Sequence, residues 1–548
     1  MADAKKQSEG SIGIKETLTS LIIAFMLAFL FRGFVIEGFQ IPTGSMAPTL
    51  LGKHIRFQGD ESGYNWETGP WTYNQYRQPV RNQTGILVQD PMSGLEYADS
   101  NRRLAAGDRV FVLKYLPLIQ QPERWDVVVF KNPGEHINYI KRLVGLPGEQ
   151  LAIVDGDVFA RPYVEGQTAP SGWDAWTTDD WQIQRKPERI QRAMLQEVFD
   201  SSYAPVENIE FRSPFTGVGS GWSGVADQRA FAFEGAGATT LLWNTIRPIT
   251  DMNAYNQTAE FYDLFLGSDQ STTRPGLRPF PTSDLSLSCN IRSEGAEVIA
   301  SPTIESRGRA FRARIDLGSG SASVQMRDAS SADSVWAEVD AGSFGAVDAG
   351  EWAHVEFWHI DQALWVFVNG ELIAGGADKG AYEWTPAQRA TAATGKSWAT
   401  LEAEDAGAGN LGVFHQTQIY GKPSVRWDFE GGAFELSHVR VQRDISYHIS
   451  QQSRTRGAHP ENFPTMDADQ YFMCGDNSSN SADSRIWGDT EINGWVRQEI
   501  DDTPGVVNRD LVVGKAFVVY FPAPLSDSGG SKLSRFFAID FGRLRWIW

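Results

Sequence analysis

The most apolar segment of the chain lies near its N-terminus, where LIIAFMLAFLF follows a polar start. No residue from Thr17 to Phe31 is charged, and the GFVI that follows Arg32 extends the apolar run to about the 20 residues that a transmembrane helix needs. The long Arg32 side chain can reach the membrane surface from such a position. The pattern therefore predicts a transmembrane anchor over residues 18–36.

The charges around this segment indicate its orientation. Lys5, Lys6 and Lys15 precede the apolar run, and the positive-inside tendency then places residues 1–17 in the cytoplasm and the rest of the chain outside. A cleaved signal peptide is the alternative. Arg32 directly follows the apolar core and no A-x-A cleavage site comes next, which favours an uncleaved anchor.

Runs of β-branched and aromatic residues follow, and they predict strands. The stretch GDRVFVLKY at 107–115 and the stretch 126–160, with its P-G and D-G turns, have this pattern. The apolar run at 511–520 predicts a closing core strand. Residues 53–106 are rich in Gln, Asn, Gly and aromatic residues, and we expect a long surface excursion there.

Residues 174–445 differ in character, being acidic, rich in Gly and Trp, and built of short alternating runs. In GEWAHVEFWHIDQALWVFVNGELIAGG, alternate side chains point to opposite faces, and Asn369-Gly370 predicts a two-residue hairpin turn. We expect His354 and His359 on the strand surface rather than as metal ligands. Many short antiparallel strands predict a β-sandwich or jelly roll. The hairpin resembles those of concanavalin-like and laminin-G-like jelly rolls, which bind glycans, proteins or calcium, or brace a neighbouring domain.

Composition narrows the function classes. The 548 residues suggest about three or four domains, and a hydrophobic content of 41 % is enough for large cores. The net charge of −19 argues against a nucleic-acid partner, because phosphate neutralisation needs Lys and Arg. The only cysteines are Cys289 and Cys474, which excludes a disulfide framework and a cysteine-based zinc site and leaves open whether the two pair.

Two stretches hold candidate catalytic residues. GFQIPTGSMAPTL contains Ser45, which by itself is an ordinary turn serine and becomes a nucleophile only where a base accepts its proton. In YIKRLVGLPGE, Tyr139, Lys141 and Leu143 share one face of a strand, so the lysine lies between two apolar neighbours. Burial lowers the pKa of a lysine, towards about 8 in this hypothesis, and so makes it a base. A lysine extended along a sheet edge is the alternative.

A third stretch is MCGDNSSNSADSRIWG at 473–488. It begins with a Gly-Asp-Asn turn signal and continues with several hydroxyls and two charged residues. Together, PTGSMAPTL, GDRVFVLKY, YIKRLVGLPGE and GDNSSNSADSRIWG, in this order behind an N-terminal anchor, resemble the motifs of the bacterial type I signal peptidases. These are membrane-bound serine–lysine peptidases.

The resemblance implies a role for each matching residue. Ser45 is then the nucleophile and Lys141 its general base, which later protonates the leaving amine. The Thr43 hydroxyl and the Ser45 N–H form the oxyanion hole, and Ser481 orients the lysine. No metal or cofactor is implied. The supporting residues are Met46 beside the nucleophile, Tyr139 near the base, Asp476, and Asp483 with Arg485 as a structural pair.

This sequence departs from the family pattern in two places. Ser478-Ser479 stands where many members carry a basic–acidic pair, so the turn must be braced differently. Roughly 300 residues, including the predicted jelly roll, separate the lysine motif from the GDN motif. Whole-domain insertions are tolerated where the host chain ends lie close together. The insertion leaves the chemistry intact and puts substrate access in doubt.

The expected fold is mainly β: an N-terminal transmembrane helix and a signal-peptidase β catalytic domain that a β-sandwich, or jelly-roll, insertion interrupts. The basic aromatic tail would cluster its apolar residues if it were helical, and contact with the membrane interface and packing on the core both stay open. The expected regions are a cytoplasmic N-terminus (1–17), the anchor (18–36), a first catalytic segment (37–165, with the excursion 53–106), a connecting segment (166–207), the laminin-G-like jelly roll (208–447), a second catalytic segment (448–526) and the tail (527–548).

These expectations describe a signal peptidase I in the inner (cytoplasmic) membrane, with its catalytic domain on the extracytoplasmic, periplasmic side. It removes signal peptides from exported preproteins after small residues of the A-x-A type. Its partners are exported preproteins and the lipid bilayer, and the inserted jelly roll suggests a glycan or protein ligand. One alternative is a dedicated serine–lysine processing peptidase with few substrates. The other is a membrane-anchored jelly-roll binding protein with a vestigial peptidase.

Overall fold

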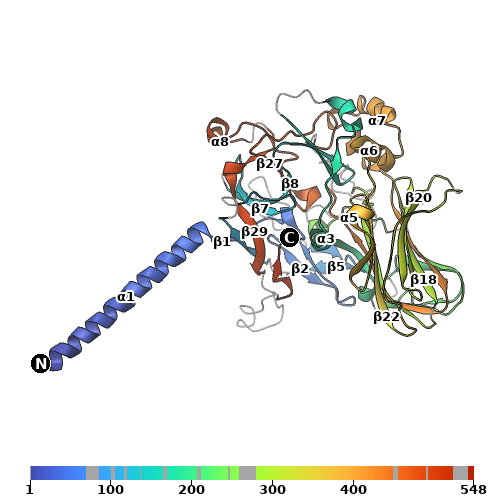
Figure 1. Cartoon of the computed structure of the whole chain (residues 1–548), viewed down its shortest axis with the longest axis horizontal. Coiled ribbons are helices and arrows are strands. Elements are labelled where there is room, and N and C mark those ends of the chain that lie inside the picture. The colour runs from blue at the N-terminus through green and yellow to red at the C-terminus, as the bar shows by residue number, and fades with distance from the viewer. Residues whose placement is uncertain are drawn as a thin grey trace.

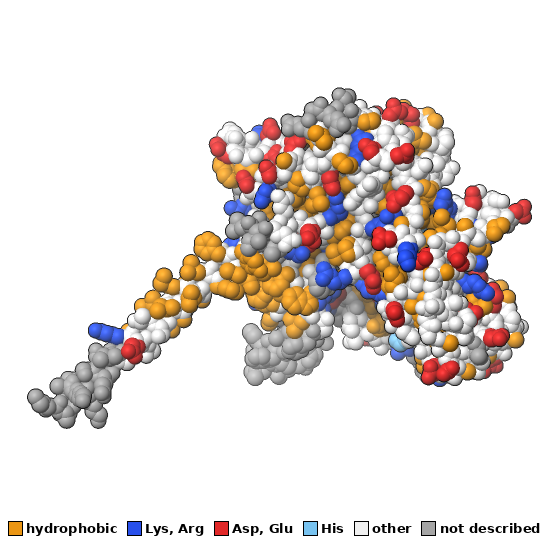
Figure 2. Space-filling view, viewed as in Figure 1, with side chains coloured by type: hydrophobic (Ala, Val, Ile, Leu, Met, Phe, Trp, Pro, Cys, Tyr) orange, Lys and Arg blue, Asp and Glu red, His pale blue; other side chains and the backbone are white. Residues whose placement is uncertain are grey.

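The N-terminal helix α1 (Ala2–Phe34) projects as a single rod from the β-rich remainder of the chain (Figure 1). Its segment Lys15–Phe34 has a mean hydropathy of 1.9, is long enough to cross a membrane, and has none of its surface buried against the protein. Figure 2 shows apolar side chains along this helix and where it meets the body. A helix satisfies its own backbone hydrogen bonds, as a bilayer core requires. The segment is consistent with a membrane anchor or a signal sequence.

The computed structural model describes most of the chain. The described residues are 2–69, 86–99, 105–115, 120–135, 137–164, 170–205, 211–244, 247–257, 279–295, 297–331, 333–448, 455–488, 492–522 and 541–547.

The first large sheet is antiparallel and is assembled from the two ends of the chain. The expected strands at 107–115, 126–160 and 511–520 are present, and two of their neighbours come from beyond residue 469. Apolar residues on its faces form two small cores. In spatial order its strands are β1 (Ile36–Gln40), β6 (Arg109–Leu113), β29 (Val512–Phe521), β7 (Val127–Lys131), β8 (Asn138–Gly145), β27 (Gln470–Cys474) and β28 (Val507–Asn508), with β30 (Arg545–Trp546) also paired to β29.

A smaller sheet of three strands continues from β8 and has helices beside it. The capping box of α6 explains where that helix begins, since Thr385 and Gln388 satisfy each other's backbone N–H groups and Pro386 follows the cap. The strands are β9 (Glu149–Val154), β10 (Asp157–Pro162) and β11 (Gln182–Ile183). Within the described residues, the other α-helices are α3 (Glu188–Met194), α5 (Gly376–Lys379), α6 (Pro386–Thr394), α7 (Trp398–Asp405) and α8 (Gly494–Glu499).

Two further antiparallel sheets share one large hydrophobic core and form the expected β-sandwich insertion. It lies at the side of the body away from α1 (Figure 1). One sheet has the order β14 (Trp222–Ser223), β15 (Ala230–Phe233), β26 (Phe434–Arg443), β17 (Leu285–Ser293), β22 (Trp352–Ile360), β23 (Ala363–Val368) and β24 (Glu371–Gly375), with β12 (Gln196–Asp200) also on β26. The other has β13 (Phe215–Val218), β16 (Thr239–Trp243), β25 (Ser424–Gly431), β18 (Val298–Ser306), β19 (Arg309–Asp316), β20 (Ser321–Asp328) and β21 (Ala337–Ser343).

The predicted hairpin of the sandwich is present, with one error in its side chains. Asn369 and Gly370 join β23 to β24 with φ of 52° and 82°, the left-handed conformation that such a turn requires. His354 lies half-exposed, as expected. His359, however, is fully buried, and its ring stacks on Phe311. The prediction of a surface position for His359 was wrong because the second sheet covers this end of the strand.

The excursion 53–106 is more structured than expected. Its described residues form two hairpins, β2 (Ile55–Gln58) with β3 (Asn65–Thr68) and β4 (Ile86–Gln89) with β5 (Glu96–Asp99). Phe57 and Trp66 stack at 5.6 Å in a small core of their own. The four-residue strands are too short to show a pattern in the sequence, which is why we expected only a surface excursion.

The described portion of the C-terminal tail is not an α-helix. Residues 541–547 form a 3₁₀ turn, η12 (Phe541–Arg543), and the strand β30, which pairs with β29. Ile547 is buried in the core of the first sheet, whereas the Trp546 side chain is exposed. Residues 523–540 of the tail lie outside the described residues.

Buried ion pairs join the β9–β10 hairpin to the sandwich. Arg307 lies 2.6 Å from Asp155 and 2.6 Å from Asp284, and Arg389 lies 3.0 Å from Asp157. All five side chains are buried. Removing one partner from such a network leaves an uncompensated charge in a low-dielectric site. The network therefore fixes the sandwich against the β9–β10 hairpin.

Candidate active site

The candidate nucleophile lies just beyond the first strand of the large sheet. After β1 the chain turns into a short 3₁₀ helix, η1 (Gly44–Met46), which carries Ser45 half-buried at its centre. Met46 is fully buried in the core beneath the sheet, next to Leu50 and Ile140. The apolar Met46 side chain thus anchors the turn and leaves the Ser45 hydroxyl directed away from that core.

Lys141 on β8 reaches the Ser45 hydroxyl. The distance from Lys141 Nζ to Ser45 Oγ is 2.5 Å, although 96 residues separate the two in the chain. Lys141 is 2 % exposed, and burial lowers its pKa from 10.5 to about 8, with the positive charge of Arg485 acting in the same direction and Asp483 opposing it. A hydrogen bond between a nucleophile and a base of lowered pKa is the arrangement that general-base catalysis requires.

Ser481 lies beside this pair. A Cβ on Gly475 would lie 2.2 Å from Ser481 Oγ and 2.4 Å from the Ser45 carbonyl oxygen, so both approach the same glycine. Gly475 thus leaves room for the two loops to meet. Among the described residues, Ser481 Oγ is buried and has no hydrogen-bond partner. Its expected hydrogen bond to Lys141 stays a prediction.

The GDN turn is braced by Asp483 and Arg485. The Arg485 guanidinium makes a bidentate pair with Asp483 at 2.8 and 2.9 Å, and the Gly475 N–H donates to Asp483 at 2.9 Å. Arg485 also donates at 2.9 Å to the hydroxyl and to the carbonyl of Ser478. Ser478 therefore takes part in bracing this turn, at one of the positions where the sequence departs from the family pattern.

Asp476 belongs to a second buried ion pair, which the sequence interpretation did not foresee. It accepts two hydrogen bonds from Arg142, at 2.6 and 2.8 Å, and one from the Thr49 hydroxyl at 2.6 Å. Arg142 is the residue after Lys141, so its side chain points to the opposite face of β8. We call residues 41–54, between β1 and β2, the nucleophile loop. On one face the strand thus ties this loop to the GDN turn, and on the other it presents the lysine.

Thr43 and Tyr139 flank the site. Thr43 is exposed in extended conformation immediately before η1. The Tyr139 ring lies 5.8 Å from Lys141 Nζ, and its hydroxyl donates to Glu135 at 3.0 Å. The structure thus brings Thr43 and Tyr139 to the surroundings of Ser45 and Lys141, and their individual roles stay predictions.

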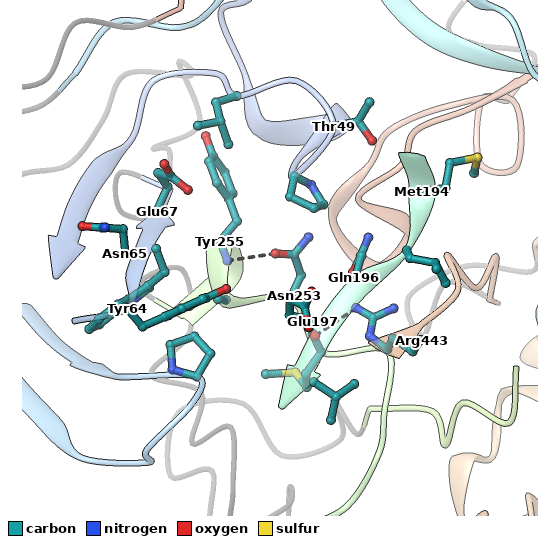
Figure 3. A pocket seen from close by; sticks show the side chains of 18 of the residues that line it. Thr49, Tyr64, Asn65, Glu67, Met194, Gln196, Glu197, Asn253, Tyr255 and Arg443 are labelled. Atoms are coloured by element: carbon teal, nitrogen blue, oxygen red, sulfur yellow. Dashed lines mark hydrogen bonds between the residues drawn. The ribbon is translucent and has the colours of Figure 1, made fainter. Parts of the chain in front are cut away.

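A segment of the insertion also reaches the nucleophile loop. The 3₁₀ helix η4 (Ala254–Asn256) packs against it, and with the loop it lines a pocket of about 310 Å³ (Figure 3). Nothing in MNAYNQ marks this segment in the sequence. Residues from distant parts of the chain line the pocket, among them Pro48 and Thr49 of the nucleophile loop, Tyr64–Glu67 of the excursion, Gln196–Val198 of β12, Asn253–Tyr255 of the inserted region, and Arg543 and Arg545 of the tail.

One cluster of carboxylates resembles a metal site by distance alone. Asp157, Asp284 and Asp361 place one oxygen each within 4.8 Å of one another. Asp157 and Asp284 pair with the arginines described above, and Lys186 lies 2.7 Å from Asp361. Protein cations therefore occupy the positions around these carboxylates, and we assign the cluster to the junction network.

A serine hydroxyl in contact with a buried lysine amine, in a chain that also carries an apolar N-terminal helix, defines a candidate serine–lysine hydrolase. The family model described as "Signal peptidase, peptidase S26" matches residues 95–196 and 430–521. The chain thus carries a peptidase S26 signal peptidase domain that an insertion splits into two segments. Lys141 and Ser481 lie within the matched segments, and Ser45 lies before the first.

Curated relatives agree with this assignment. The chain is 32 % identical over 136 residues to signal peptidase I of Buchnera aphidicola subsp. Schizaphis graminum. The aligned residues are 25 % of this chain and 30 % of that protein. It is 28 % identical over 147 residues to signal peptidase I of Rickettsia prowazekii, and the aligned residues are 27 % of this chain and 43 % of that protein. The match thus spans less than half of the length of these relatives.

Solved structures similar to the chain include sugar-binding modules. The carbohydrate-binding module CBM66 from Bacillus subtilis covers 42 % of this chain and 96 % of its own, with 7 % identity and a TM-score of 0.23. The exoplasmic/lumenal domain of VIP36, in a form bound to Ca²⁺ and Man3GlcNAc, covers 44 % and 87 %, with 6 % identity and a TM-score of 0.23. The assignment of a β-sandwich rests on the strand pairing itself.

Proposed function

We propose that this chain is a membrane-bound signal peptidase I that cleaves exported preproteins after small residues by a Ser45–Lys141 dyad. The observation that carries the proposal is the 2.5 Å contact between Lys141 Nζ and Ser45 Oγ in a buried site. Membership of the matched segments in the peptidase S26 family supports the reaction class. The α1 helix supports a position at the membrane, with the sheet on the extracytoplasmic side by the positive-inside tendency.

The geometry supports a two-step acyl transfer. Neutral Lys141 accepts the Ser45 proton as the oxygen attacks the scissile carbonyl, and the oxyanion is stabilised by the Ser45 N–H and, in this proposal, the Thr43 hydroxyl. Protonated Lys141 then donates its proton to the leaving amine. A water molecule, deprotonated by the same lysine, releases the signal peptide from the serine. With a pKa of about 8, roughly a tenth of Lys141 is neutral at pH 7.

The edge of β8 supports the binding of an extended substrate. β7 pairs with β8 along Asn138–Arg142, whereas β27 pairs with it only along Arg142–Gly145. Within the described stretches of the chain, no strand therefore covers the second edge of Asn138–Lys141. A signal-peptide segment added there as a strand would pass beside the dyad.

The test is cleavage of a preprotein with an Ala-x-Ala site by the detergent-solubilised full-length protein. Ser45→Ala and Lys141→Ala should each abolish correct N-terminal processing, since nucleophile and base are both required. Lys141→Arg should be equally inactive, because a guanidinium keeps its proton. Ser319→Ala and Lys396→Ala, on the surface of the inserted region, are the matched controls and should cleave like the wild type. Turnover that survives Ser45→Ala or Lys141→Ala would contradict the mechanism.

The alternatives give different results in the same experiment. A dedicated processing peptidase would cleave few preproteins and would still depend on both residues. A binding protein with a vestigial peptidase would cleave none. Saturable glycan binding by the full-length protein would add a role for the sandwich without removing the peptidase.

A further inference from the structure

The helix η4 of the insertion packs directly on the nucleophile loop. It lies outside both segments that match the peptidase family. A Cβ on Gly44 would lie 1.9 Å from Tyr255 Cε1. The tyrosine ring therefore fits against residue 44 only because that residue is glycine and has no side chain. The Tyr255 hydroxyl donates to the Lys53 carbonyl at 2.6 Å, and Asn253 Nδ2 donates to the Ala47 carbonyl at 3.1 Å. The insertion thus contacts the loop on both sides of Ser45.

Asn256, the last residue of η4, forms a reciprocal amide pair with Asn477 of the GDN turn. Asn256 Nδ2 donates to Asn477 Oδ1 at 2.8 Å, and Asn477 Nδ2 donates to Asn256 Oδ1 at 2.9 Å. Asn480 donates to the same Asn256 oxygen at 3.2 Å, and Ser479 Oγ accepts from Asn256 at 3.2 Å. Asn256 is 5 % and Asn477 1 % exposed, so water cannot readily replace a lost partner.

Asn477 in turn holds the backbone of the nucleophile. Its side chain donates to the Gly44 carbonyl at 2.9 Å, and its backbone N–H donates to the Ser45 carbonyl at 3.1 Å. The Gly44 carbonyl and the Ser45 N–H belong to one planar trans peptide and point in opposite directions. A hydrogen bond that fixes this carbonyl therefore also fixes the direction of the Ser45 N–H.

We propose that Asn256 is a positioning residue for the reaction: through Asn477 it orients the Gly44–Ser45 peptide so that the Ser45 N–H points at the developing oxyanion. The inference rests on the proposed function and deepens it. The chain of contacts runs from Asn256 to Asn477, then to the Gly44 carbonyl and across the peptide plane to the Ser45 N–H. The insertion then contributes a component of the active site.

The test compares Asn256→Ala and Asn256→Asp with the control Asn290→Ala in full-length protein. Asn290 lies on β17 and bonds His354 at 2.7 Å, so its loss also removes an amide from the insertion, away from the dyad. Alanine removes both bonds to Asn477, and aspartate keeps the size but places an oxygen against Asn477 Oδ1. We measure kcat and KM on a peptide with an Ala-x-Ala site, the affinity for a peptide aldehyde that adds to Ser45 as a tetrahedral hemiacetal, and the thermal unfolding midpoint.

A misdirected oxyanion donor weakens the transition state more than the bound substrate. Both Asn256 variants should lose about 10- to 100-fold in kcat, with KM nearly unchanged, and aldehyde affinity should fall by a similar factor. Asn290→Ala should match the wild type in all three values. This pattern in a folded variant supports the proposal, because loss of packing alone does not weaken the tetrahedral adduct selectively.

Other results overturn it. If the wild type is active and Asn256→Ala has the same kcat, this inference is wrong and the proposed function stands. A lower kcat with full aldehyde affinity shows that Asn256 does not act through the oxyanion donor and overturns the inference. Unfolding of both variants at the assay temperature assigns Asn256 to stability. An inactive wild type overturns the proposed function, and this inference with it.

Discussion

Two adjacent residues of β8, Lys141 and Arg142, are both cations and both fully buried, yet their surroundings differ. Arg142 meets the Asp476 carboxylate in a bidentate pair, which raises its pKa despite burial. Lys141 has the Ser45 hydroxyl as its hydrogen-bond partner, and no carboxylate lies within ion-pair distance of it among the described residues. Burial then dominates and favours the neutral amine. Strand alternation alone separates the structural cation from the candidate base.

The lowered pKa of Lys141 predicts a pH dependence. Because the neutral amine is the active form, kcat/KM should rise with pH through about 8 and level off above it. Initial rates on an Ala-x-Ala peptide across this range measure the profile, with the folded state followed by circular dichroism. A midpoint near the ordinary lysine value of 10.5 would show that burial does not act on this amine as described.

At the scale of single residues, the sequence predicts several residues of the candidate site but not Asn256. The motifs place Ser45, Lys141 and Ser481 together, because the resemblance supplies the three-dimensional arrangement that spacing cannot. Asn256 carries no such signal: its partner Asn477 lies 221 residues away, and an amide in an irregular segment has no pattern. The contact between Asn256 and Asn477 arises only when the chain has folded, so no local sequence pattern predicts it.

At the scale of elements, β8 and the GDN turn form one unit with the nucleophile loop. Asp476 joins all three, through Arg142 on the strand and Thr49 on the loop. The sequence pattern of residues 138–145 predicts a strand. It does not predict that both faces are buried beyond Ile140, because that burial comes from segments distant in the sequence that pack on the two faces. The hairpins within 53–106 escaped prediction for a related reason, since Phe57 and Trp66 find each other only after folding.

Removing one partner of this buried pair should be costly. Asp476→Ala should lower the free energy of unfolding by about 3–5 kcal/mol, because the Arg142 charge is left uncompensated. Chemical denaturation of the detergent-solubilised protein measures the change. The double variant Arg142→Met/Asp476→Leu should recover much of the loss, since it removes both charges. A loss in the double variant as large as in the single one would contradict this account.

At the scale of the molecule, the contacts that fix the sandwich to the peptidase domain include η4 on the nucleophile loop and the network around Arg307 and Arg389. Sequence pattern predicts the sandwich as a class of fold, because alternation and turn residues are local. It does not predict the junction, where Arg307 and Arg389 meet Asp155 from 152 and 234 residues away along the chain.

The junction network should contribute measurably to stability. Arg389→Met leaves Asp157 without its closest cation, and should lower the free energy of unfolding by about 3–5 kcal/mol. Burial already raises the pKa of Asp157, so the loss should grow as the pH rises and the carboxylate ionises. Denaturant titrations at acidic and neutral pH measure it. Arg314→Met, at an exposed pair with Glu430, is the control and should change stability by less than about 1 kcal/mol. Equal effects of the two variants would contradict the role of the network.

The direct connection of α1 to β1 limits how far Ser45 can lie from the end of the helix. Ser45 comes eleven positions after Phe34, the end of the helix, and even a fully extended chain over these eleven steps reaches at most about 40 Å. With α1 in the bilayer, as proposed, this span sets the greatest distance of Ser45 from the membrane surface. Under the proposed function, peptide bonds farther from the membrane surface are out of reach of Ser45 whatever their sequence, so a mature protein that folds away from the bilayer is not cleaved.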